Sequence, residues 1–405
     1  MLVVAVEKRE QWLLQDDSGN SENGTGNMVT LNWNQVNTWR LAQQHLIERA
    51  ERRQMPAVVT NLGGVQAQLM SAAELSLWAR VQNLTPAAVR EALWETRTLV
   101  KTWAMRGTLH LLPAHEFPLY VAAFSTFRHY RRASWLKYHG LTNDELEALL
   151  AGVRATLTDT GITREQLADA IAERTATPKL RELLRSGWGA LLKPSAFRGD
   201  LCFGPGQGRQ VTFVQPTRWL GEQPQVAADA ALPALLRRYL TAYGPATPDE
   251  FARWSGLEAA VAKRLFRESG DELTAVRVAD WAAWALTATL ESLQNMELSS
   301  GCVRLLPHFD VYTIAVARHS QYLLPPAQRK RVYRAQGWIS PVVLVDGRIA
   351  GVWEYDRQHA PVPVTVSLFD PPTEQIHQGI ADETARLGMF LESEVALTVQ
   401  HDDGG

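Results

Sequence analysis

Two glutamines separated by one residue, Gln66 and Gln68, follow Gly63 and Gly64 in a segment that is otherwise apolar. Residues i and i+2 lie on the same side of an extended segment but point nearly opposite ways on a helix. Because a glycine pair favours a bend or a break, we expect the chain to be locally extended here. Both carboxamides would then project into one space.

A pair of neutral amides suits one kind of chemistry. Their donors and acceptors can hold a water molecule, but they cannot deprotonate it strongly. The pair therefore fits a reaction that needs a positioned water and no strong base. The same spacing also fits a simpler arrangement, in which one glutamine caps a backbone group and the other is solvated. The surrounding sequence has to distinguish the two.

Length and composition predict a globular protein of several domains. The 405 residues exceed what one ordinary core holds, and 46% hydrophobic with 21% charged residues is typical of globular chains. The net charge of −2 excludes a uniformly basic nucleic-acid binder but allows local basic patches. Cys202 and Cys302 are far apart and lack metal-ligand spacing, which indicates a reducing cytosol rather than a disulfide framework.

The N-terminal residues do not have the pattern of a targeting segment. The apolar stretch in MLVVAVEKREQW is too short for a signal peptide, and no apolar run in the chain is long enough to span a membrane. Residues 14–28 are rich in Gly, Asn, Ser and Asp. We therefore expect a cytoplasmic protein with no membrane association. Residues 1–28 are predicted to form a disordered extension, and Met28 is a candidate natural start.

Three successive stretches share one plan, in which two or three short helices precede a β-hairpin. This plan is the winged helix, a helix-turn-helix variant with a β-wing. In the first stretch Thr85 is a candidate N-cap before Pro86, and a hairpin turns near Arg106 and Gly107. The third stretch ends in two short strands that join near Asp280.

The second stretch carries the strongest local signals. Thr142 and Thr163 each precede a Glu or Gln by three residues, which predicts two capping boxes. A third helix is expected over 178–194, followed by a hairpin over 200–214. The Gly-rich turn of this hairpin is not a phosphate loop, because it lacks the Lys-Ser/Thr ending and the helix that should follow.

Beyond about Cys302 the pattern changes to strands, with a two-residue hairpin at Asp346 and Gly347 and one helix before the last strand, VALTVQ. We expect a small β-barrel or a curled sheet. The predicted fold class is therefore α+β, with three winged helices and a C-terminal β-barrel. The expected boundaries are 29–135, 136–225 and 226–300 for the three winged helices and 301–405 for the barrel.

Several segments of the chain resemble those of a known family. The segments GGVQAQ, LWARVQNLTP, LVKTWAMRGTLHLLP, LLPHFDVY and GWISPVVLVDGRIAGVW, in that order, are similar to the winged-helix DNA glycosylases of the AlkZ/YcaQ kind, which unhook interstrand crosslinks. The resemblance extends from Met28 to about Gln400. It implies three tandem winged helices and a barrel, curved into a C shape around duplex DNA. It also implies that a Gln-x-Gln or Gln-x-Asp motif is catalytic, so Gln66 and Gln68 place this chain in the Gln-x-Gln branch.

The residue types are consistent with that chemistry. A guanine alkylated at N7 is cationic and already leaves well, so little general acid is needed. The sugar passes through an oxocarbenium-like state, and the carbonyl oxygens of Gln66 and Gln68 could place a water and stabilise positive charge. Most glycosylases flip the target base, but a crosslinked base is tethered, so an open concave site is expected. The resemblance implies a monofunctional monomer that acts on double-stranded DNA carrying alkylated guanine and uses no metal or cofactor.

Basic residues that could contact DNA occur in local runs. Phosphate contacts position a protein on DNA without reading its sequence. His110, His308 and Asp310 are interpreted as structural residues of a strand, a barrel and a turn. The candidates for DNA contact are Arg106 in the first hairpin, Arg128, Arg131, Arg132 and Lys137 in the following segment, and Lys179, Arg181 and Arg185 in the second unit; Arg329, Lys330, Arg331 and Arg334 form a further run.

Two other functions remain compatible with the sequence. Three winged helices would also suit a non-catalytic DNA-binding protein or transcriptional regulator, although a regulator has no need for two amides at a concave centre. A protein that sequesters a DNA-alkylating metabolite would need a deep apolar pocket. The preferred lesion is not specified by these motifs.

Overall fold

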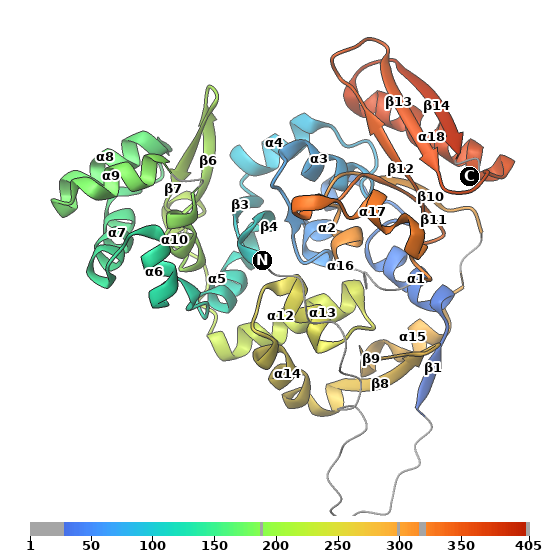
Figure 1. The fold of residues 1–405 in the computed structure, drawn as a ribbon, viewed down its shortest axis with the longest axis horizontal. Coiled ribbons are helices and arrows are strands. Elements are labelled where there is room, and N and C mark those ends of the chain that lie inside the picture. The colour runs from blue at the N-terminus through green and yellow to red at the C-terminus, as the bar shows by residue number, and fades with distance from the viewer. Residues whose placement is uncertain (1–27, 187–188, 298–299, 316–320, 402–405) are drawn as a thin grey trace, which may run out of the picture.

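The computed structural model describes residues 28–186, 189–297, 300–315 and 321–401. The predicted disorder of the N-terminal extension, apart from Met28, falls outside these residues. The described residues form a mixed α+β fold (Figure 1), which confirms the predicted class.

The first unit is built around a three-stranded antiparallel sheet with the order β2-β4-β3. The predicted N-cap is present, since the Thr85 hydroxyl accepts from the Ala88 N–H. The predicted hairpin joins β3 to β4. The elements are α1 (Trp33–Gln43), α2 (Met55–Asn61), β2 (Val65–Gln66), α3 (Met70–Trp78), α4 (Pro86–Trp94), β3 (Leu99–Trp103), β4 (Leu109–Pro113) and α5 (Phe117–Phe124).

The second unit has the predicted capping boxes at Thr142 and Thr163 and the predicted hairpin. The helix expected over 178–194 is instead divided into α9 and α10. Gly189 between them has a φ of +83°, and a Cβ there would lie 2.8 Å from the Trp103 ring, so the chain turns at this point. The elements are α6 (Ala133–His139), α7 (Asn143–Thr156), β5 (Ile162–Thr163), α8 (Arg164–Thr175), α9 (Pro178–Ser186), α10 (Lys193–Phe197), β6 (Cys202–Gln207), β7 (Gln210–Val214) and α11 (Pro216–Trp219).

The third unit contains α12 (Ala228–Tyr243), α13 (Pro248–Ser255) and α14 (Ala259–Glu268), then β8 (Leu273–Val278), β9 (Trp281–Leu286) and α15 (Leu290–Gln294). Its hairpin turns at Ala279 and Asp280, as predicted. The sequence did not predict that β1 (Val29–Leu31) would join this sheet, where it pairs in parallel with β8. The N-terminal strand therefore links the first and third units.

The C-terminal unit differs from the expected barrel. Its strands form an open five-stranded sheet in the order β10-β11-β12-β13-β14, and within the described residues the edge strands β10 and β14 do not pair. The Asp346–Gly347 hairpin is confirmed, and α18 crosses over between the parallel strands β13 and β14. The elements are β10 (Val303–Leu306), α16 (Val311–Ala315), α17 (Arg329–Val332), β11 (Val342–Val345), β12 (Arg348–Tyr355), β13 (Val362–Leu368), α18 (Glu374–Leu391) and β14 (Val395–His401).

The first unit lies at the centre of the molecule, with the second unit on one side and the C-terminal sheet on the other (Figure 1). Buried polar contacts join the units. The guanidinium of Arg40 donates to the carbonyls of Tyr243 at 3.0 Å and Pro245 at 2.9 Å in the third unit. The guanidinium of Arg80 binds Asp310 of the C-terminal unit, and both side chains are fully buried. The central unit is thus held from two sides.

Candidate active site

The glycine pair before the two glutamines forms a sharp corner between α2 and β2. Gly63 and Gly64 have φ values of +65° and +101°, which side chains with a Cβ rarely adopt. A Cβ on Gly64 would also lie 2.8 Å from Leu112 Cδ2. The chain leaves this corner as the short strand β2, so the predicted extended segment is present as far as Gln66 and ends before Gln68.

Both glutamines lie beside β4, although only Gln66 belongs to β2 and Gln68 lies in the bend that follows it. Gln66 lies opposite His110 of β4, and the Ala67 N–H donates to the Leu109 carbonyl at 2.7 Å. Ala67 is fully buried, which explains a small apolar residue between the glutamines. The two amides have different surroundings, because Gln66 is only 8% exposed whereas Gln68 is exposed. The Gln68 Oε1 lies 3.5 Å from the Leu109 N–H, at the limit of a hydrogen bond.

Arg106, predicted as a DNA contact, lies against the glutamine pair. It occupies the β3–β4 turn with a φ of +58° and is half-buried. Its Nη2 donates to Gln66 Oε1 at 2.8 Å, and its Nη1 donates to the Trp254 carbonyl at the end of α13. The guanidinium therefore reaches across from the first hairpin to the third unit. A DNA contact by Arg106 stays a prediction.

His110 is a buried neutral histidine beside this guanidinium. Burial, together with the charge of Arg106, lowers the pKa of His110 to about 3. Its Nδ1 lies 3.0 Å from the Thr108 carbonyl, which can only accept, so Nδ1 carries the proton. Its Nε2 is then an acceptor, 3.4 Å from Arg106 Nη2. A histidine of this kind supports its neighbours and does not supply a proton near neutral pH.

The other predicted DNA contacts lie on the surface away from the glutamines, and most of them pair with carboxylates of this chain. Arg132 binds Glu258, which links the segment after the first unit to the third. Arg128 donates to the Ser125 carbonyl, and Lys137 is exposed. The remaining pairs are Arg131 with Glu147 at 2.6 Å, Lys179 with Glu145 at 2.9 Å, and Arg181 and Arg185 with Asp169, each at 2.8 Å. Exposed ion pairs are weak and can exchange for phosphate, so these residues remain candidates.

Lys193 is a basic residue near the first hairpin that no sequence pattern indicated. This residue begins α10 of the second unit, and its Nζ would lie 3.7 Å from a Cβ on Gly107, next to Arg106. Burial lowers the pKa of Lys193. Burial is also the main cause of the lowered pKa values of His129 and His139, and the charge of Lys193 adds to it. The lysine occurs in an unremarkable ALLKP segment, and only the fold brings it near the first hairpin.

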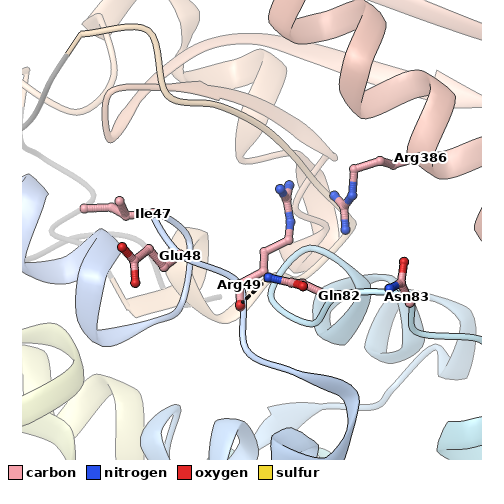
Figure 2. Close-up of a pocket in the computed structure, with 6 residues that line it drawn as sticks. All are labelled: Ile47, Glu48, Arg49, Gln82, Asn83 and Arg386. Atoms are coloured by element: carbon pink, nitrogen blue, oxygen red, sulfur yellow. Dashed lines mark hydrogen bonds between the residues drawn. The ribbon is translucent and has the colours of Figure 1, made fainter.

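A polar cavity of about 450 Å³ lies elsewhere, between the first unit and α18, and is lined by Ile47, Glu48, Arg49, Gln82, Asn83 and Arg386 (Figure 2). Arg49 and Arg386 both bind the buried carboxylate of Glu383. None of the predicted site residues lines this cavity. Its arginines fasten α18 to the first unit, so we interpret it as a structural junction.

The described residues lack two features that other kinds of function require. No three His, Cys, Asp or Glu side chains come together there in a way that could hold a metal ion. No described helix is long and apolar enough to cross a membrane.

Comparison with known proteins gives one consistent result. Residues 59–390 match the family described as DNA glycosylase AlkZ-like. The chain is 38% identical over 354 residues to an interstrand DNA cross-link repair glycosylase of Streptomyces sahachiroi, a match that covers 85% of this chain and 92% of the relative. The structure superposes on that of S. sahachiroi DNA glycosylase AlkZ with a TM-score of 0.83 and 34% identity, over 92% of this chain and 100% of the other. The chain therefore belongs to the AlkZ-like family of DNA glycosylases, enzymes that hydrolyse N-glycosidic bonds in DNA.

Proposed function

We propose that this enzyme removes N7-alkylguanine from duplex DNA, as single adducts or as interstrand crosslinks, by attack of a water held at Gln66 and Gln68. The observation that carries the proposal is the corner at Gly63 and Gly64, after which two neutral amides lie next to each other beside β4. The similarity to the S. sahachiroi interstrand DNA cross-link repair glycosylase supports crosslinks as substrates.

The chemistry explains why amides suffice. An N7-alkylated guanine leaves as a neutral base, so the bond breaks without a strong acid. The sugar carries positive charge in the transition state, and a water on its open face completes the hydrolysis. Amide groups can orient that water through hydrogen bonds. A neutral His110 next to the pair is not a general acid near neutral pH, which fits a reaction that needs none.

The three helix-and-hairpin units are proposed to act as tandem winged helices that curve around the duplex. Exposed basic residues of the first two units, including Arg131, Arg132 and Lys137, would contact phosphates. An open surface of this kind would accept a base tethered to the opposite strand, which a closed flipping pocket would not. Both glutamines come from one chain, so the proposal requires only a monomer.

The test is base release from duplexes carrying N7-methylguanine or a nitrogen-mustard crosslink. We expect Gln66→Ala, Gln68→Ala and the double variant to lose release while retaining DNA binding. Gln378→Ala is a matched control, because Gln378 is an exposed glutamine on α18 that bonds Asp382. Release at the wild-type rate by the double variant would contradict the catalytic assignment. Activity on the adduct but not on the crosslink would restrict the proposed substrate.

A further inference from the structure

The orientation of the Gln66 carboxamide is determined by its partner. The oxygen and nitrogen ends of a glutamine amide are usually hard to distinguish. A guanidinium, however, has five N–H donors and no acceptor. Since Arg106 Nη2 lies 2.8 Å from one end of the Gln66 amide, that end must be the carbonyl oxygen. The NH₂ group of Gln66 therefore points away from Arg106.

Arg106 is itself held from the third unit. Its Nη1 donates to the carbonyl of Trp254, in the last turn of α13, where unpaired carbonyls carry partial negative charge. Gly256, just beyond this helix, has a φ of +82°, and a Cβ there would lie 2.8 Å from the backbone of Arg106. The Trp254 ring also packs against Gly63, since a Cβ on Gly63 would lie 3.0 Å from it. The end of α13 thus contacts both the arginine and the glycine corner.

Neutral His110 is the third group near Arg106, on the same face of the sheet as Gln66. It lies opposite Gln66 in the strand register, and its Nε2 faces Arg106 Nη2. The guanidinium therefore has acceptors on three sides: a carboxamide oxygen, a helix-end carbonyl and an imidazole nitrogen. Such an arrangement fixes a side chain on a tight turn and leaves it little freedom to swing toward a phosphate.

We propose that Arg106 is a positioning residue that locks the Gln66 carboxamide, so that Gln66 presents its NH₂ to the reaction and Gln68 supplies the accepting carbonyl. The inference rests on the proposed function of the glutamine pair and assigns a different role to each glutamine. An oxygen already bound by a cation is a poor acceptor for a water that must become nucleophilic. Gln68 is exposed and its Oε1 makes only a long contact of 3.5 Å with the Leu109 N–H, so this oxygen keeps a lone pair that can accept from that water. The third unit then controls the catalytic amide through Trp254 and Arg106.

The first test separates positioning from phosphate binding. Arg106→Lys and Arg106→Ala should lower the single-turnover rate of N7-methylguanine release about ten- to hundredfold, the loss of a charge-assisted hydrogen bond. Affinity for a duplex carrying a tetrahydrofuran abasic analogue should change less than about threefold, with an unaltered salt dependence. Arg53→Ala is the control, because Arg53 is 81% exposed and pairs with Glu51. A loss of affinity with a salt slope reduced by about one would overturn the proposal in favour of a phosphate contact.

A second variant tests the amide orientation with Arg106 left in place. In Gln66→Glu the carboxylate can still accept from Arg106, so the fold should be kept, but the NH₂ is lost. We expect release to fall as far as in Gln66→Ala. Retained activity in Gln66→Glu would show that Gln66 acts as an acceptor and would overturn this assignment of roles.

The outcomes also distinguish this inference from the proposed function. Adding Arg106→Ala to Gln66→Ala should cost nothing further, because the amide that Arg106 positions is already gone. If Gln66→Ala and Gln68→Ala are inactive while the Arg106 variants match wild type, the catalytic pair stands and the positioning role fails. If the glutamine variants release base normally, the proposed function itself fails.

Discussion

The buried ion pair between Arg80 and Asp310 should be the most costly polar contact to break in this protein. The Asp310 carboxylate is fully buried and accepts four hydrogen bonds. Arg80 donates two of them, Nη1 to Oδ2 and Nη2 to Oδ1, each at 2.8 Å. The Ser76 hydroxyl at 2.6 Å and the Tyr312 N–H at 2.9 Å supply the other two. Ser76 belongs to α3, the helix that directly follows the glutamine pair.

Asp310→Ala would leave the guanidinium of Arg80 buried without its carboxylate. Removing one partner of a buried pair costs about 3–5 kcal/mol, because the other charge stays desolvated. Total stabilities of about 5–15 kcal/mol make this a large fraction of the free energy of unfolding. By contrast, the similarly bidentate pair of Arg237 and Glu272 lies on the surface, so Glu272→Ala should have little effect.

The measurement is urea unfolding followed by tryptophan fluorescence for wild type, Asp310→Ala, Glu272→Ala and the double variant Arg80→Met/Asp310→Leu. The double variant removes both charges, so it should recover most of the stability that Asp310→Ala loses. A loss below about 1 kcal/mol in Asp310→Ala, the range of exposed pairs, would refute the reasoning. So would a double variant that is no more stable than Asp310→Ala.

Two further predictions concern the surroundings of the glutamines. Gly256→Ala should be destabilised and should lose release activity, because its Cβ would lie 2.8 Å from the backbone of the first hairpin. Gly140→Ala is the control: Gly140 has a similar φ of +67° but no atom within 4 Å of its Cβ position, so this variant should lose only the stability that the unfavourable φ costs. Activity in Gly256→Ala equal to that in Gly140→Ala would contradict the close packing. The pKa of His110 is about 3 in the folded state, below its ordinary value of 6.5, so the unfolded chain takes up the proton first and stability falls as pH drops below about 6.5. Between pH 7 and pH 5 wild type should lose about 2 kcal/mol more unfolding free energy than His110→Gln, and equal losses would show that His110 is not held neutral.

Local signals predicted the secondary structure well because they act over a few residues. The capping box at Thr142 and the hairpin at Asp346 and Gly347 depend on neighbours at most four positions away, and both are present. Gly189 shows the limit of such signals. The apolar pattern around it predicts one helix, but the ring of Trp103 from the first unit packs against it and the chain turns. Whether the C-terminal sheet closes is likewise decided by its edge strands, which no local pattern describes.

The candidate site was predicted in part for the same reason. Gln66 and Gln68 could be found from a glycine corner in their own segment. Arg106 could be named as a basic residue on a hairpin, but its partners come from β2 and from α13, whose Trp254 is 148 positions away. Lys193 could not be found at all, since its approach to Gly107 depends on how the second unit packs on the first. Spacing identifies chemical groups, whereas only the packing of units says what each group faces.

The charges around the glutamine pair explain why residue 66 is an amide. A carboxylate there would form an ion pair with Arg106, and both of its oxygens would be acceptors that point toward a cation. The amide lets one end bind the guanidinium while the other end remains a donor. Neutral His110 adds no second positive charge to a site that, under the proposed function, accepts a cationic base. The guanidinium of Arg106 also donates to the Trp254 carbonyl at the end of α13, whose partial negative charge offsets part of its positive charge. In the proposed mechanism the cation orients the Gln66 amide, and the exposed Gln68 binds the water.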